Sequence, residues 1–417
     1  MSGVRRPCAM IGRVIDPHVV RRNTVLLAGT LTCLTGMVQL VVAVATITLV
    51  LVTGIKSILG LGPAVFLASS AVAALPAGRA MDRRGRVPVL AAGCLSGVAG
   101  CLLAAAGSAV ESAFLVIPGF VLVGAASGIV LLARAAAADL YPPERRAHGI
   151  SLVLFGALFG AALGPLVFRP LLAGKELDAD SLVVPYLAAA AIMVVGLVIV
   201  TRVRPDPSVY ARRISTAPPP VSAASLRTIL ARPGAVPGVA AAVASFAVMV
   251  SVMNLTGYII VGHGHAQADV FTVISFHIVG MYSLVLVVGR LIDRVGRRPS
   301  LVSGLLIEAV STLGLAVSSS VPATSLCLFG LGIGWNVAYV AAAAQLADVA
   351  LASERGRLLG FTDLLSAGTG AALALAGGVV YTQLGVAALA LGATALALFP
   401  AAWLLTRPPQ PAIAAGD

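Results

Sequence analysis

Two short stretches of charged residues interrupt long apolar runs in this 417-residue chain. They read GRAMDRRGRVP (78–88) and GRLIDRVGRRP (289–299), and the second matches the first at seven of eleven positions. An aspartate near the end of an apolar helix lies at the negative end of the helix dipole. It needs a positive partner, and the arginine four residues later can reach it across the intervening glycine. These residues therefore favour ion pairing at two related positions rather than covalent catalysis.

No residue set typical of an enzyme or of an ATP-driven pump is visible. Serines and histidines are scattered through apolar segments without the arrangement of a triad, and no P-loop pattern occurs. The five cysteines form neither a disulfide framework nor a metal-ligand spacing. We therefore expect no catalytic residues, no cofactor and no metal site.

The composition is that of a membrane protein. Hydrophobic residues make up 59% of the chain and charged residues 11%, against roughly 45–50% and 25% in soluble domains. A bilayer core requires about 20 mostly apolar residues for each spanning helix. The runs favour helices over barrel strands because they are apolar at nearly every position instead of alternating. Twelve runs qualify: 25–53, 57–77, 88–107, 112–138, 148–168, 183–201, 236–261, 270–289, 299–318, 323–347, 357–381 and 384–405.

The net charge of +12 follows membrane topology rather than a nucleic-acid surface. Arginines gather in alternate loops, whereas the opposite loops contain only Lys56, Arg169 and Lys175. Because basic residues favour the cytoplasmic side, we expect both termini in the cytoplasm and a lipid bilayer, not a nucleic acid, as the partner. The first apolar run is too long for a removable signal and should remain as the first helix.

The chain divides near its middle at a stretch rich in Pro, Ser and Arg, which is typical of a linker. Besides the repeated charged loops, ADLYPPERR (138–146) has an echo in ADVALASERGR (347–357). The two halves therefore look like parallel repeats. The expected organisation is a cytoplasmic tail (1–24), a six-helix bundle (25–201), a cytoplasmic linker (202–235), a second six-helix bundle (236–405) and a second cytoplasmic tail (406–417).

The pattern G-x-x-x-D-R-x-G-R between helices 2 and 3, repeated between helices 8 and 9, resembles that of the major facilitator superfamily. The resemblance covers essentially the whole chain. Within the family, the chain is similar to prokaryotic twelve-helix drug and metabolite permeases. It implies an all-α membrane protein with twelve transmembrane helices in two pseudo-symmetric bundles. It also implies a secondary transporter of the bacterial cytoplasmic membrane that works by alternating access.

The resemblance assigns a conformational gate to the two charged loops. In the family, the motif aspartate, its arginine and an acid at the end of helix 4 form a cluster facing the start of helix 11, and a mirrored set faces the start of helix 5. Together they would latch the cytoplasmic gate while the cavity is open outward. The alternative is that the arginines only set the topology and the acids are solvated. The gate residues are Gly78, Asp82, Arg83, Gly85, Arg86, Asp139, Gly289, Asp293, Arg294, Gly296, Arg297 and Asp348.

Helix 5 carries glycines at intervals of four residues, Gly156, Gly160 and Gly164, followed by Pro165. Small residues at this spacing let two helices approach closely. In the family, a glycine-rich helix 5 that ends in Gly-Pro is associated with antiporters, and the match here is partial. Packing explains the glycines about as well as antiport does.

Four ionisable residues fall inside predicted spans, where they are costly and therefore candidates for function. They are Arg134, His277, Glu308 and Asp363, and we consider them for proton coupling. Asp363 could instead be the partner of a loop arginine, and Glu308 could have a structural role within the C-terminal half. A buried histidine is most often neutral and hydrogen-bonded to a neighbour.

The substrate cavity is expected near the bilayer midplane between the halves. In the family, helices 1, 4, 7 and 10 line it. Trp335 is informative because tryptophan favours the membrane interface and this one is mid-helix, although tight helix packing is an alternative. The polar and aromatic candidates on these helices are Gln39, Asn254, Tyr258, Trp335, Asn336 and Tyr339.

A mostly apolar cavity with aromatic edges suits a small lipophilic or weakly cationic molecule. We expect a monomer that exports such a drug-like or metabolite substrate in exchange for protons. Proton-coupled uptake of a vitamin or metabolite is the alternative. A transporter-like sensor or scaffold is a third possibility, but the linker and tails are too short for the soluble domain that it would be expected to carry.

Overall fold

The computed structural model describes residues 16–55, 61–163, 180–214, 224–265 and 267–406, although a few side chains within these ranges are not described. Every regular element in the described ranges is helical. The first half contains α2 (Pro17–Thr53), α3 (Leu61–Arg84), α4 (Arg86–Ala109), α5 (Ala113–Val130), α6 (Ala133–Leu140), the short 3-10 helix η2 (Pro143–Arg145), α7 (Arg146–Leu154), η3 (Asp180–Leu182) and α9 (Val183–Thr201).

Two short helices lie in the central segment, and the second half contains the remaining elements. The short helices are α10 (Pro207–Ile214) and α11 (Leu226–Leu230). The second half comprises α12 (Ala235–Gly262), α13 (Gln267–Tyr282), α14 (Val285–Val295), α15 (Arg297–Val317), α16 (Val321–Val349) and α17 (Arg355–Thr406).

The expected all-helical membrane fold is confirmed. In the described residues, ten helices are long and apolar enough to cross a bilayer, and the bent pair α13 and α14 would make an eleventh. Each of the twelve predicted runs falls at least partly on a described helix. The long helix α17 covers the last two runs and changes direction at Gly385, where φ is 79°.

Some helices extend beyond the apolar runs. Helix α3 continues to Arg84 instead of ending at 77, and α14 continues to Val295 instead of 289. Arginines in the last turn are compatible with a helix because they complement the negative end of its dipole. Apolar character marks the part of a helix that lies in lipid, so it does not mark where the helix ends.

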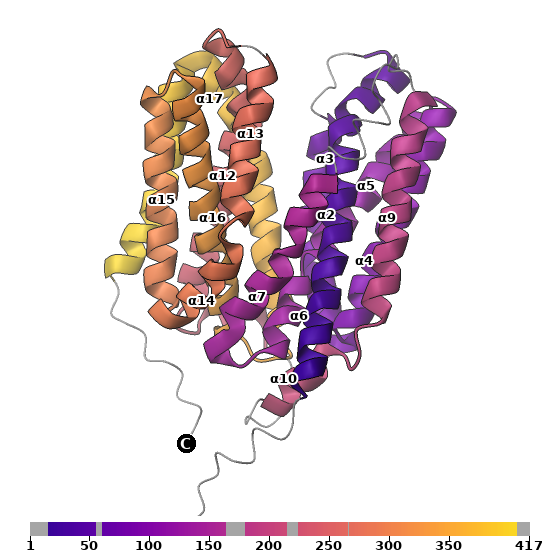
Figure 1. Ribbon diagram of the computed structural model, residues 1–417, viewed down its shortest axis with the longest axis vertical. Helices are drawn as coiled ribbons and strands as arrows, with labels where there is room; N and C mark the ends of the chain where they lie inside the picture. Colours follow the sequence, from indigo (N-terminus) through magenta and orange to yellow (C-terminus); the bar gives the residue numbers. More distant parts are fainter. Residues whose placement is uncertain (1–15, 56–60, 164–179, 215–223, 266, 407–417) are drawn as a thin grey trace, which may run out of the picture.

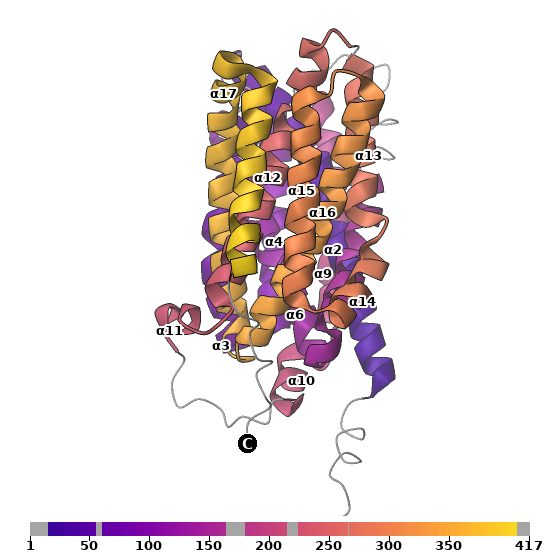
Figure 2. The same ribbon diagram turned by 90° about the vertical axis from the view of Figure 1, so that its left-hand side faces the viewer.

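The helices form two groups that lie against each other at one end of the molecule and diverge toward the other (Figure 1). The first group runs from indigo to magenta and the second from orange to yellow. At the converging end, α3 packs on α17 and α7 packs on α14. The view turned by 90° shows α3 ending near the same level as α6 and α14 (Figure 2).

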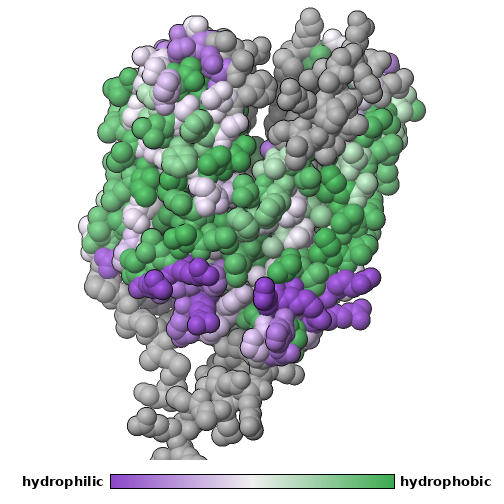
Figure 3. Space-filling model, in the orientation of Figure 1, coloured by the Kyte–Doolittle hydropathy of each residue, from purple (hydrophilic) through white to green (hydrophobic). Residues whose placement is uncertain are grey.

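The surface separates into an apolar belt and a hydrophilic band. Hydrophobic residues cover the sides of both groups of helices, and hydrophilic residues form a band at the converging end (Figure 3). We call this end the charged end: it is where α3 and α14 end and where α7 and α17 begin. An exposed apolar belt of this kind is the surface that a bilayer covers.

Glycines of the two charged loops have distinct roles. Gly85 and Gly296 end α3 and α14 with φ of 94° and 101°, a region that side chains disfavour. Gly78 and Gly289 instead allow helices to touch. A Cβ atom on Gly78 would overlap the carbonyl oxygen of Gly356, and one on Gly289 would lie 2.7 Å from that of Ala147. Each loop therefore needs one glycine for a turn and one for contact between the halves.

The segment after α9 is fastened to the first half through Asp206. Its carboxylate accepts hydrogen bonds from the backbone N–H groups of Val87 at 2.8 Å and Ser208 at 2.9 Å. Burial raises the pKa of Asp206, but the hydrogen bonds from Val87 and Ser208 outweigh burial, so the pKa lies below its ordinary value. The charged carboxylate thereby caps the start of α4.

Replacing Gly85 by alanine tests the turn at the end of α3. The backbone there has φ 94° and ψ 173°, and we expect Gly85→Ala to lower the free energy of unfolding by about 1–3 kcal/mol because a side chain is strained in this region. Thermal unfolding of the detergent-purified protein measures it. Gly392→Ala is the control, since no atom lies within 4 Å of the added Cβ position. Equal unfolding temperatures for both variants would contradict the prediction.

Candidate functional site

The first ion-pair cluster joins the end of α3 to the start of α17. Asp82 accepts hydrogen bonds from the backbone N–H groups of Gly356 at 2.9 Å and Arg357 at 2.8 Å. Amides in the first turn of a helix have no partner within it and carry partial positive charge. Arg86 donates a further hydrogen bond to Asp82 at 2.9 Å. One carboxylate of the first half therefore binds a helix start of the second half.

Asp139 completes this cluster between two arginines. Its carboxylate accepts from Arg86 at 2.7 Å and from Arg355 at 2.5 Å. Arg86 also donates to the carbonyl oxygen of Ala352 at 2.6 Å. Asp139 has no exposed surface, and Arg86 is 1% exposed. The cluster is thus a buried charge network whose members come from both halves.

The second cluster repeats this geometry with the halves exchanged. Asp293, near the end of α14, accepts from the backbone N–H groups of Ala147 at 3.2 Å and His148 at 2.9 Å, in the first turn of α7. Arg297 donates to Asp293 at 2.6 Å and to the carbonyl oxygen of Pro143 at 2.6 Å. The carboxylate of the second half therefore binds a helix start of the first half.

Asp348 has the place in the second cluster that Asp139 has in the first. It accepts from Arg297 at 3.0 Å and from Arg146 at 2.6 Å. Its side chain is 27% exposed, whereas that of Asp139 is fully buried. The two clusters have the same connections but differ in their access to solvent.

Arg146 and Arg355 are part of these clusters, although they are not among the predicted gate residues. A signal for them exists: the same shift of 209 residues relates Asp139 to Asp348 and Arg146 to Arg355. Arg83 and Arg294, which the family motif includes, are exposed. Neither forms an ion pair with another described residue.

A further ion pair joins the halves deeper in the bundle. Arg134 of α6 donates to the carboxylate of Asp363 on α17. Both side chains are buried. Arg134 also donates to the carbonyl oxygen of Leu131 at 3.0 Å, at the break between α5 and α6. Two of the candidates for proton coupling are therefore partners of each other.

Two aromatic rings from α16 adjoin this pair. The Arg134 guanidinium lies 5.2 Å from the ring centre of Tyr339, within the range of a cation–π interaction. Tyr339 in turn stacks on Trp335 with ring centres 4.9 Å apart and an angle of 16°. A small pocket between α6, α12, α16 and α17 is lined by Arg134, Tyr339 and Asp363 among others.

Several polar atoms in this pocket or on the ring stacked beside it lack a hydrogen-bond partner among the described residues. Asp363 Oδ2, Arg134 Nε, the Tyr339 hydroxyl and the Trp335 indole N–H are buried without a hydrogen-bond partner among the described residues. Unpaired buried polar groups are costly, so such a concentration is typical of a binding site. The pocket combines one carboxylate, one guanidinium and aromatic surface.

The other cavity candidates lie elsewhere or are not described. Asn336 donates to the carbonyl oxygen of Met281 at 2.7 Å, close to the 43° bend between α13 and α14. Gln39 is half-buried on α2. The side chains of Asn254 and Tyr258 lie outside the described residues. The described candidates that line the pocket therefore belong to α6, α16 and α17.

Glu308 and His277 are buried within the second half. Glu308 accepts a hydrogen bond from the Ser245 hydroxyl and has no cationic partner among the described residues. A ring nitrogen of His277 lies 2.8 Å from the carbonyl oxygen of Leu328. Neither residue contacts the Arg134–Asp363 pair through a described hydrogen bond. Each hydrogen bond joins two helices of the second half, although Glu308 Oε2 and His277 Nε2 also have no hydrogen-bond partner among the described residues.

Gly156 and Gly160 of the fifth predicted run (148–168) pack against α2. A Cβ atom on Gly156 would overlap the carbonyl oxygen of Ala28, and one on Gly160 would overlap that of Thr32. Thr32 also donates to the carbonyl oxygen of Gly156 at 2.7 Å. Gly164 and Pro165 lie outside the described residues. Helix packing accounts for Gly156 and Gly160, and their association with antiport stays a prediction.

Known proteins resemble the chain over most of its length. The model of the Major Facilitator Superfamily matches residues 25–285 and 263–416. The uncharacterized MFS-type transporter YdeG of Bacillus subtilis (strain 168) is 32% identical over 364 residues, which cover 83% of each chain. The riboflavin transporter RfnT of Brucella anthropi is 30% identical over 302 residues, covering 72% of this chain and 74% of RfnT.

The fold also matches a solved structure. The human organic anion transporter MFSD10 superposes with a TM-score of 0.76, covering 94% of this chain and 100% of that one. The two sequences are 16% identical. At this level of identity the match concerns the fold alone.

The difference in burial between the two clusters can be tested. Asp139→Asn leaves the buried Arg355 without a carboxylate and Arg86 with Asp82 alone, and we expect it to lower the free energy of unfolding by about 3–5 kcal/mol. Asp348→Asn should cost less, because Asp348 and its partner Arg297 are partly exposed, so Arg297 can be hydrated. Thermal unfolding in detergent compares the two variants. An equal or larger loss for Asp348→Asn would show that burial does not set the difference.

Proposed function

Because the chain belongs to the major facilitator superfamily, whose members are secondary transporters and not enzymes, we propose that it exports a small molecule in exchange for protons. The substrate in this proposal is lipophilic or weakly cationic and crosses the bacterial cytoplasmic membrane. The observation that carries the proposal is the buried Arg134–Asp363 pair between the halves.

The charged end acts as the cytoplasmic gate in this proposal. Basic residues gather at that end, as expected for the cytoplasmic side of a membrane, and both termini would then also be cytoplasmic. The carboxylates of Asp82 and Asp293 bind helix starts of the opposite halves. These contacts support an arrangement that is closed to the cytoplasm, with the two six-helix bundles rocking about the gate.

Proton binding to Asp363 is the proposed coupling step. When the charged end opens, α6 and α17 separate and the Arg134–Asp363 pair must break. An unpaired charge in the membrane interior is costly. A proton on Asp363 neutralises the carboxylate and removes the attraction that holds Arg134. Protonation therefore lowers the barrier to opening.

The substrate would compete for the same carboxylate. A weakly cationic molecule can replace the proton on Asp363, and the ring of Tyr339, which lines the same pocket, offers an aromatic surface. Because the proton and the substrate bind to the same carboxylate, Asp363 can hold only one of them at a time. Exclusive occupancy of this kind produces exchange rather than cotransport.

Uptake is the second candidate, favoured by the similarity to the riboflavin transporter RfnT. The stacked rings of Trp335 and Tyr339 could hold a planar heterocycle by continuing the stack. In that case the proton and the substrate would move in the same direction. The two candidates differ in the direction of proton flux and not in the residues involved.

The test uses proteoliposomes that contain a trapped pH dye and an imposed pH gradient. Lipophilic cations, dyes and riboflavin are added one at a time, and we expect a lipophilic cation to trigger proton movement opposite to its own. Asp363→Asn should reduce this flux to that of protein-free liposomes, because an amide cannot carry the proton. Glu308→Gln is the matched control: it also removes a buried acid, but one without a cationic partner among the described residues.

Each outcome has a defined meaning. Proton flux in the direction of the substrate would replace export by uptake. Substrate movement that ignores the gradient would contradict proton coupling. Full proton flux in Asp363→Asn would show that Asp363 does not carry the coupling proton. Loss of proton flux in Glu308→Gln, at an unchanged unfolding temperature, would assign a coupling role to Glu308 instead. Asp363→Glu should retain exchange and thereby exclude simple misfolding as the cause of a loss.

A further inference from the structure

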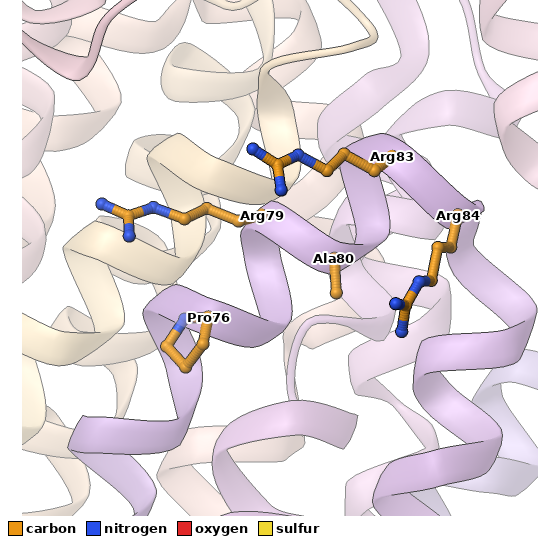
Figure 4. A pocket seen from close by; sticks show the side chains of 5 residues that line it. All are labelled: Pro76, Arg79, Ala80, Arg83 and Arg84. Carbon is orange, nitrogen blue, oxygen red and sulfur yellow. The ribbon is translucent and has the colours of Figure 1, made fainter.

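A basic pocket lies on the outer face of α3, apart from the site between the halves. It has a volume of about 260 Å³ and is lined by Pro76, Arg79, Ala80, Arg83 and Arg84. Figure 4 shows Arg79 and Arg83 extending in the same direction from successive turns of α3, with Arg84 at the last residue of the helix. The volume is below the roughly 300–1,000 Å³ of sites for drug-sized ligands.

The three arginines of this pocket have no partner among the described residues. All three are exposed, and none donates a hydrogen bond or forms an ion pair with any residue that the structure describes. Like charges four residues apart on a helix repel each other. An anion among the three guanidinium groups would remove this repulsion and accept several charge-assisted hydrogen bonds.

The pocket differs from its counterpart in the second repeat. Arg290 and Arg294 match Arg79 and Arg83 in the aligned loops. The place of Ala80, however, is taken by Leu291 and that of Arg84 by Val295. The larger leucine side chain would fill the floor of the pocket, and the third charge is missing. The gate motif, which both repeats share, therefore does not explain the first pocket.

The position of the pocket points to a membrane lipid. The candidate span of α3 runs from Ala64 to Arg84, so its last turns lie where an apolar segment meets the charged end. Pro76 lies about 12 Å deeper along the helix axis than Arg84. A ligand that fills the pocket thus meets three guanidinium groups and the apolar side chains of Ala80 and Pro76, and Pro76 lies deeper than all three arginines.

We propose that this pocket binds the head group of an anionic phospholipid. The phosphate lies among Arg79, Arg83 and Arg84, because planar guanidinium groups bind phosphate oxygens through paired hydrogen bonds. The glycerol backbone and the start of the acyl chains cover Ala80 and Pro76. Free phosphate would pair with the arginines but would leave the apolar surface of Ala80 and Pro76 uncovered. A zwitterionic lipid would bring its own positive charge next to three arginines, which is unfavourable. This proposal does not depend on the substrate or the direction of transport.

The experiment measures lipids bound to the purified full-length protein by native mass spectrometry. Micelles contain phosphatidylglycerol or phosphatidylcholine at equal mole fraction. We expect phosphatidylglycerol to be retained preferentially by the unaltered chain. Arg79→Gln/Arg84→Gln should lower that preference by roughly tenfold or more, since it removes hydrogen bonds to a charged group. Arg290→Gln/Arg294→Gln removes the same number of charges from the second repeat and should change the preference little.

The outcomes separate a built pocket from a generally basic surface. Equal losses in both double variants would mean diffuse attraction to the whole charged end and would overturn the proposal. Unchanged preference in Arg79→Gln/Arg84→Gln would overturn it as well. Displacement of phosphatidylglycerol by inorganic phosphate would assign the pocket to a free anion instead of a lipid. Unfolding temperatures of both variants establish that each is folded.

Discussion

The structure depends on two carboxylates, each of which lies at the unfavourable, negative end of its own helix dipole. Asp82 and Asp293 lie near the C-terminal ends of α3 and α14, where the helix dipole is negative. Each is compensated by two backbone amides at the start of a helix in the other half. The favourable electrostatics of both halves therefore require that they meet at the charged end.

The two clusters contain corresponding ion pairs but differ in their exposure to solvent. In the first, Asp139 is fully buried between Arg86 and Arg355. In the second, a quarter of the Asp348 side chain is exposed, so water can replace its partners at lower cost. A gate built from both would lose its second contact more readily than its first. The pseudo-symmetry of the sequence therefore does not imply a symmetric opening.

The sequence was sufficient for features that depend on local chemistry. Apolar runs located the helices, and the spacing of Gly85 and Arg86 after Asp82 indicated a turn with an ion pair across it. It was insufficient where long-range packing decides. Arg134 and Asp363 are 229 residues apart, and either could have paired with a loop residue. The Asn336 amide donates to the carbonyl oxygen of Met281, next to a bend beside Gly280 and Ser283, and neither the bend nor this partner was predicted.

The position of Arg134 explains how the pocket and the gate can act as one unit. Helix α6 carries both Arg134 and Asp139, which are about 7–8 Å apart along the helix axis. Helix α17 carries their partners, Asp363 and Arg355, about 12 Å apart. The same two helices are thus joined twice, once at the pocket and once at the charged end. In the proposed transport cycle, a change of charge at Asp363 would therefore act on a short helix that also carries Asp139, the partner of Arg355.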